Sequence, residues 1–396
     1  MSPKQNLDED LISTMQLTRR ILRIIGIWPL TSRSSRTERI VKKILNCVCY
    51  FLFSIILVPG TLQIVKREKN LQLRLKICAP LLNFSLSFLQ YTILLFRAQD
   101  ILKGVQQMSE DWKNVSNEDR NILLNKAQVG RKLVQIAALF MYGGGLCYRT
   151  IIPLSKVFLS KGNSTIRPLP CPSYYVKFNE QETPAYEIIF GLQFLAGVVV
   201  YSVKCGLCGL SAFFVMHVCG QLGIIMDRLN TLADREDIED VIVDKRISVI
   251  VSLQIKAWAF LKDIEQIVEY VCIIEMLACT LVICLVGYYI LELEKNNFAA
   301  ILGYVVILIS FVFSIFIFCY IGQRLDDEST DVGLASCTVE WYRLPIRKAR
   351  CLLLIIAMSN SPMKVTAGKM VDMCLSSFTS IMKTSIAYLN MLRTVI

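Results

Sequence analysis

The side chains that could carry chemistry are sparse in this chain of 396 residues, and their spacing favours no reaction. His217 is the single histidine, so neither a Ser/His/Asp triad nor a zinc-protease motif can be assembled convincingly around it. Cys205 and Cys208 form the one CxxC spacing among fifteen cysteines, inside an apolar run that has no second cluster of metal ligands. The acidic run 234–240 lacks the Asx-Gly pattern of a calcium loop. We therefore expect no enzyme, no metal site and no cofactor.

Long apolar runs dominate the chain and predict an all-α protein that crosses a membrane several times. Hydrophobic residues make up 54% of the sequence, and the charged residues lie between the runs. A helix needs about 20 apolar residues to cross the hydrocarbon core of a bilayer. Seven runs meet this requirement, at 44–65, 74–97, 133–155, 186–216, 267–290, 298–321 and 374–394.

The distribution of basic residues predicts the orientation of these spans. The segments 1–43, 97–132, 219–266 and 322–369 hold 29 Lys and Arg, whereas the segments on the other side hold 10. By the positive-inside rule the N-terminus is cytoplasmic, and seven spans then leave the C-terminus outside. The sequon at Asn163 falls in an outside loop, which predicts glycosylation there. Cys171 lies in the same loop, and a disulfide with Cys147 is left open.

The chain divides into four parts. Residues 1–43 form a cytoplasmic segment whose apolar positions and arginines predict an amphipathic helix, either lying on the membrane surface or packed against the bundle. Residues 44–321 hold the first six spans, 322–373 form a polar cytoplasmic segment, and 374–396 hold the last span.

The stretch 318–393 resembles the insect odorant receptors. It carries, in that family's order and spacing, Phe318-Cys319-Tyr320, Trp341-Tyr342, Thr366-Ala367-Gly368-Lys369, Lys383-Thr384-Ser385 and Tyr388. Tyr388 followed by Met391-Leu392-Arg393 favours this family over its sister, the gustatory receptors. The short segment 219–266 is similar to that of the variable tuning subunits and lacks the insertion of the shared coreceptor. A gustatory-type channel and, less favoured, a G-protein-coupled receptor are the alternatives.

The resemblance implies an odorant-gated, non-selective cation channel in the plasma membrane of a sensory neuron dendrite. Four subunits, this chain and the coreceptor among them, would surround one pore, and segment 322–373 would be the anchor where they pack. The last helix would line the pore, with Met391 and Val395 as the hydrophobic gate and Thr394 as a polar pore residue. We expect the lipid bilayer and a small volatile odorant as further partners, and no nucleic acid.

The resemblance also implies an odorant pocket in the outer half of the first six spans. The residues expected to line it are Asn83, Phe84, Tyr142, Cys147, Tyr148, Phe190, Gln193, Phe194, Tyr304, Ile307 and Leu308. Aromatic rings with a few polar groups suit a small volatile molecule that is bound mainly by apolar burial. The same residue types also fit ordinary packing between helices.

Overall fold

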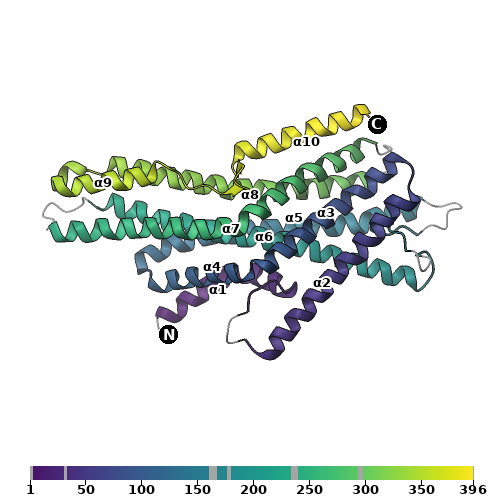
Figure 1. The fold of residues 1–396 in the computed structure, drawn as a ribbon, viewed down its shortest axis with the longest axis horizontal. Helices are drawn as coiled ribbons and strands as arrows, with labels where there is room; N and C mark the ends of the chain where they lie inside the picture. Colours follow the sequence, from purple (N-terminus) through teal and green to yellow (C-terminus); the bar gives the residue numbers. More distant parts are fainter. Residues whose placement is uncertain are drawn as a thin grey trace.

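The computed structural model describes residues 3–30, 34–159, 167–175, 180–232, 240–292 and 298–395, and most of them are helical (Figure 1). The helices are α1 (Pro3–Ile24), α2 (Arg36–Leu62) with the π-helical turn η1 (Gln63–Arg67), α3 (Leu71–Phe96), α4 (Ala98–Asn114), α5 (Asn117–Leu159), α6 (Ala185–Asn230), α7 (Asp240–Glu292), α8 (Phe298–Thr338), the 3-10 turn η2 (Trp341–Arg343), α9 (Ile346–Ser359) and α10 (Leu375–Val395). Two short strands, β1 (Thr366–Ala367) and β2 (Val371–Asp372), pair antiparallel just before α10.

The seven expected spans fall on α2, α3, α5, α6, α7, α8 and α10, which confirms the predicted all-α class. Five stretches of the described residues are long and apolar enough to cross a membrane: Arg36–Arg67, Leu71–Phe96, Ala185–Asn230, Ile242–Glu292 and Ala300–Thr338. The spans expected on α5 and α10 are more polar, because α5 carries Arg149 and α10 carries Lys383 among serines and threonines.

Helix α6 lies at the centre of the bundle, packed against α5, α7 and α8 (Figure 1). It is apolar on every side, and nearly all its residues from Val200 to Ile225 are buried. A helix without a polar face has no side to present to water, so it takes the core position. The other long helices surround it and hold most of the buried aromatic and aliphatic side chains.

Several helices are much longer than a membrane is thick. Helix α7 has 53 residues, which at 1.5 Å per residue is about 80 Å, against about 30 Å for the hydrocarbon core. The N-terminal part of α7, which extends beyond the thickness of a membrane, and the C-terminal half of α8 run together toward α9, at the left of Figure 1. The boundary drawn at residue 322 thus falls inside one continuous helix, and Lys126 of α5 pairs there with Glu328 of α8.

The N-terminal helix α1 packs on the bundle through its apolar face. Leu22 and Ile25 are fully buried, and Gly206 of α6 leaves room for the Leu22 side chain. Gly26, at φ +70°, turns the chain after the helix, a conformation that costs glycine little. The sequence left open whether this helix lies on the membrane surface or packs against the bundle. In the structure it packs against the bundle.

Two further expectations concern the loop after α5. Cys147 and Cys171 are both free thiols, so the disulfide left open between them is not formed. Asn163, the predicted glycosylation site, lies outside the described residues.

Candidate functional site

A small cavity of about 40 Å³ lies where α3, α5, α6, α7 and α8 meet. Its wall is mostly aromatic and aliphatic with a few polar groups: Lys76, Ala79, Pro80, Asn83, Phe84, Tyr148, Arg149, Tyr201, Val282, Val286, Tyr289, Tyr304, Ile307 and Phe311. Most of these residues lie toward one end of the bundle, at the right of Figure 1, where α3 begins and α5 and α7 end. Concave, mainly apolar sites with a few convergent polar groups are typical of small-molecule binding.

Five of the eleven residues expected at a pocket line this cavity, namely Asn83, Phe84, Tyr148, Tyr304 and Ile307. The rings of Tyr148 and Tyr304 meet edge to face with their centroids 5.6 Å apart, and Tyr304 stacks on Tyr289 at 5.8 Å. Contacts of this kind hold each ring in one orientation. The aromatic side of the cavity therefore has a defined shape.

The other six expected residues lie outside the cavity wall: Tyr142, Cys147, Phe190, Gln193, Phe194 and Leu308. Two of them tie elements together instead. The Tyr142 hydroxyl shares a hydrogen bond of 2.7 Å with that of Ser202, which links α5 to α6. The fully buried Gln193 accepts from the Cys171 N–H at 2.9 Å and donates to the Cys171 carbonyl oxygen at 3.1 Å, so it holds the loop after α5 on α6.

Arg149 is one of nine lining residues that the sequence interpretation missed, and it is the buried charged one. Its side chain is buried on α5, where Nε donates to the Tyr201 hydroxyl at 3.2 Å and Nη1 to the Gln193 carbonyl oxygen at 2.6 Å. The guanidinium carbon lies 5.2 Å from the Phe84 ring centroid and 5.9 Å from that of Tyr201. An ionisable side chain within a predicted span is costly and points to a functional site. That signal was present in the sequence at residue 149.

A buried ion pair lies next to the cavity. Lys204 of α6 and Glu275 of α7 are 2.7 Å apart, and each side chain is 2% exposed. Gln90 of α3 donates to the Glu275 carboxylate at 2.8 Å and Ser314 of α8 donates to it at 2.6 Å. The ammonium lies 5.5 Å from the ring centroid of Phe311, a cavity residue. We call these four polar residues the buried polar node, and they join four helices directly beside the cavity.

Helix α10 packs on α7 and α8 along one stripe and leaves its other faces uncovered (Figure 1). Ile381 and Ser385 of that stripe are buried, and the Phe378 ring meets Phe316 of α8 at 5.6 Å. Met391, of the expected gate, is 63% exposed, and Thr394 is exposed as well. The side chain of Val395, the other residue of the expected gate, lies outside the described part of the chain. The uncovered surface of α10 carries both apolar and polar side chains, and it is available to lipid or to neighbouring subunits.

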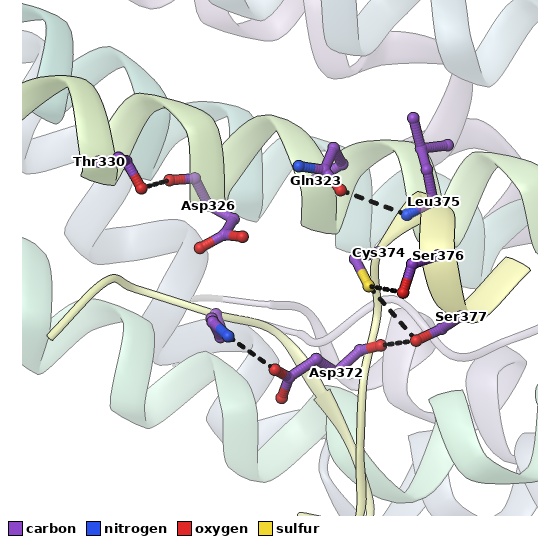
Figure 2. Close-up of polar contacts among 9 residues, drawn as sticks. Gln323, Asp326, Thr330, Asp372, Cys374, Leu375, Ser376 and Ser377 are labelled. Atoms are coloured by element: carbon purple, nitrogen blue, oxygen red, sulfur yellow. Dashed lines mark hydrogen bonds and ion pairs between the residues drawn. The ribbon is translucent and has the colours of Figure 1, made fainter.

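Polar contacts tie the start of α10 to α8 and to the strand pair (Figure 2). The Leu375 N–H donates to the side-chain oxygen of Gln323 on α8 at 3.3 Å, and the Ser377 hydroxyl donates to the Asp372 carbonyl oxygen at 2.6 Å. The Cys374 sulfur lies 3.3 Å from the Ser377 hydroxyl. These contacts join α8 directly to the first turn of α10.

A second polar cluster lies around Asp111 of α4. It belongs to the end of the bundle that holds α9 and the start of α7, which we call the long end of the bundle. The Asp111 carboxylate accepts from Gln221 at 2.7 Å, lies 3.1 Å from His217 Nε2, and forms an ion pair with Lys256. Burial by itself raises the pKa of Asp111, but the hydrogen bonds from His217 and Lys256 outweigh it and hold that pKa below its ordinary value of 3.8. The single histidine thus has a structural, hydrogen-bonding role.

Comparison with known proteins identifies the family. The family model described as 7tm Odorant receptor matches residues 70–386, a range that includes every residue of the cavity wall. The chain belongs to the odorant receptor family. It is 22% identical to Odorant receptor 10 of Aedes albopictus over 75% of this chain and 77% of that protein. It is 20% identical to Odorant receptor 13a of Drosophila melanogaster over 94% of both.

The fold of this odorant receptor is shared with a solved structure. The insect olfactory receptor OR5 from Machilis hrabei, in complex with eugenol, matches with a TM-score of 0.79 and 15% sequence identity, over 98% of this chain and 99% of that one. Without eugenol the same protein matches with a TM-score of 0.76. The family model and the named relatives confirm the odorant receptor interpretation over the two alternatives. The protein is a multi-pass membrane protein of a family that is not one of enzymes.

Proposed function

We propose that this odorant receptor is the ligand-binding tuning subunit of a heteromeric, odorant-gated, non-selective cation channel. The observation that carries the proposal is the uncovered face of α10, which packs on the bundle by one stripe only. In a tetramer with the coreceptor, the uncovered faces of four such helices would surround a pore. The N-terminus would be cytoplasmic and the C-terminus outside, in the plasma membrane of a sensory neuron dendrite, with the long end of the bundle as the anchor between subunits.

The gate would be formed near the end of α10. Met391 and Val395 are one helical turn apart and so share a face. A ring of four such apolar side chains, contributed by this chain and by the coreceptor, would be narrow, and such a constriction excludes ions by losing its water. Thr394, beside them, offers a hydroxyl to water when the pore opens.

The cavity would be the odorant site. Its aromatic wall and few polar groups suit a mainly apolar volatile by chemistry, and the OR5 structure matched by this fold is a complex with eugenol. At about 40 Å³ the cavity is smaller than such a ligand, so binding would require the wall to expand. The wall includes α7 and α8, the two helices on which α10 packs, so expansion would act on the helices that hold α10.

Coupling between cavity and gate would follow those helices. Phe311 of the cavity contacts Lys204 of the buried polar node, and the node includes Glu275 of α7 and Ser314 of α8. Both helices contact α10 directly. A ligand opens the pore to the extent that it binds the open arrangement more tightly than the closed one.

The test is whole-cell current from cells that express this chain with and without an insect coreceptor, under a broad odorant panel. We expect a ligand-evoked current that requires both subunits and whose ion selectivity or resting level changes with Met391→Ala. The matched control is Ile386→Ala, also exposed on α10 but about 140° around the helix from Met391. Surface-expressed protein that gives no current and signals through a G protein, with an external N-terminus, would contradict the proposal.

A further inference from the structure

The cavity carries positive charge that its own wall does not balance. Lys76 and Arg149 both line it, and none of the other lining residues is an aspartate or glutamate. Within the described ranges no carboxylate lies at ion-pair distance from Arg149. Its two hydrogen-bond acceptors, the Tyr201 hydroxyl and the Gln193 carbonyl oxygen, are both neutral. Lys76 lies with its ammonium 5.6 Å from the Tyr289 ring centroid, another neutral contact.

Arg149 is held in a fixed place in the wall. Its side chain is 5% exposed, and Gly197 of α6 makes room for it, because a Cβ there would overlap the guanidinium. The rings of Phe84 and Tyr201 flank the guanidinium. These contacts orient the group without neutralising it. A buried charge that lacks a counter-charge is expensive in a low-dielectric setting, which favours binding of a ligand that supplies the missing partner.

The Asn83 side chain offers a second polar group in the same wall. The Asn83 side-chain oxygen is buried and receives no hydrogen bond from the described residues. Because the oxygen and nitrogen of an amide are assigned from their surroundings, a half turn of this group would present its NH₂ to the cavity instead. Asn83 of α3 and Arg149 of α5 thus give the apolar cavity two polar groups from two helices.

We propose that the cavity binds a small, mainly apolar ligand that carries a carbonyl or carboxylate oxygen, and that it excludes amines. The proposal deepens the odorant site described above and rests on it. The planar guanidinium of Arg149 donates to that oxygen, for which its fork of N–H groups is suited. The hydrocarbon part of the ligand packs against Tyr148, Tyr304 and the aliphatic wall. An ammonium group is repelled by Arg149 and Lys76.

The first measurement needs no channel activity. Thermal unfolding of the purified full chain in lipid nanodiscs is recorded with four seven-carbon probes: heptanoate, 2-heptanone, heptane and heptylamine. We expect heptanoate and 2-heptanone to raise the midpoint more than heptane, and heptylamine to have the least effect. A larger shift with heptanoate would identify an anionic ligand, and a larger shift with 2-heptanone a neutral carbonyl. Equal shifts for heptylamine and heptanoate would overturn the proposal.

Two variants assign the preference to Arg149. Arg149→Met should weaken 2-heptanone and heptanoate binding by about tenfold to a hundredfold, the range of a charge-assisted hydrogen bond, while heptane binding stays the same. Arg149→Lys keeps the charge but loses the fork of N–H groups. Its affinity for 2-heptanone and heptanoate should therefore lie between those of the unsubstituted chain and Arg149→Met. Arg131→Met, an exposed arginine on the same helix, is the matched control. If the Arg149→Met chain does not fold, the proposal is tested on the unsubstituted chain and on Arg149→Lys. It fails if Arg149→Lys binds the oxygenated probes as tightly as the unsubstituted chain does.

The same probes separate this inference from the channel proposal. If the purified chain ranks the probes as expected but cells expressing it with the coreceptor give no current, the ligand class stands and the channel proposal fails. If odorants evoke current with no preference for oxygenated probes, and Arg149→Met leaves their order unchanged, the channel proposal stands and the ligand class is wrong.

Discussion

The buried polar node makes a sharp prediction about stability. Lys204→Met removes the only cation beside Glu275 in the node and leaves its carboxylate with hydrogen bonds from Gln90 and Ser314. Both members of the pair are 2% exposed, so water cannot replace the lost partner. Removal of one partner from such a pair destabilises a protein by about 3–5 kcal/mol. The double variant Lys204→Met/Glu275→Gln should lose much less, because it leaves no charge unpaired and the amide can still bond to Ser314.

The assay is the free energy of unfolding of the purified full chain, from denaturant titration in mixed micelles. Lys103→Met is the control, because the Lys103 side chain is 78% exposed and lies 3.7 Å from Asp100. Exposed pairs of this kind contribute about 0–1 kcal/mol. A loss for Lys204→Met no larger than for Lys103→Met would refute the reasoning. So would a double variant whose loss equals the sum of the two single losses, since contacting charges must show coupling.

Three further perturbations test other parts of the structure. Gly322→Ala places a Cβ onto the Met373 carbonyl oxygen ahead of α10 and should lower the free energy of unfolding by about 1–3 kcal/mol, whereas Gly143→Ala, with nothing within 4 Å of its Cβ, should not. Asp111 has a depressed pKa, so its contribution to stability is present at neutral pH and is lost as pH falls below 3.8; Asp111→Asn should remove this part of a pH titration of stability, and an unchanged profile would contradict the assignment. Gln193→Leu leaves the Cys171 N–H without its acceptor, while the Cys171 carbonyl oxygen keeps the bond from Ser173, and should cost about 1–3 kcal/mol, with faster hydrogen exchange in residues 171–173; protection equal to that of the unsubstituted chain would contradict this role.

The fold class follows from the sequence because the membrane imposes a simple requirement. Every spanning helix needs about 20 residues compatible with lipid or with a protein interior. The seven runs therefore coincide with helices of the structure. The length of those helices outside the membrane was predicted only in part, since the continuous passage of α8 through residue 322 depends on its packing against α5 and α9.

The candidate site was predicted less completely, for a reason visible in α6. A helix that is apolar on all sides gives no periodic signal of which face points inward. Tyr201, which lines the cavity, and Gln193, which does not, both lie on this helix and are both buried. Phe84 and Tyr148, expected at the pocket by comparison with a family, line the cavity, whereas Tyr142, from the same apolar run as Tyr148, bonds to Ser202 outside its wall.

The sequence by itself determined that this chain is a helical membrane protein, how its apolar runs are ordered, and, through the pattern of residues 318–393, that it resembles the odorant receptors. Only the tertiary structure decided that Lys76, Asn83, Arg149 and Tyr201, from three different helices, line one cavity. The physical reason is that contacts across helices depend on rotation and close approach, which small residues set locally. Gly145 and Gly197 let Tyr201 and Arg149 lie against neighbouring backbones, and no spacing along one helix shows which partner will come that near.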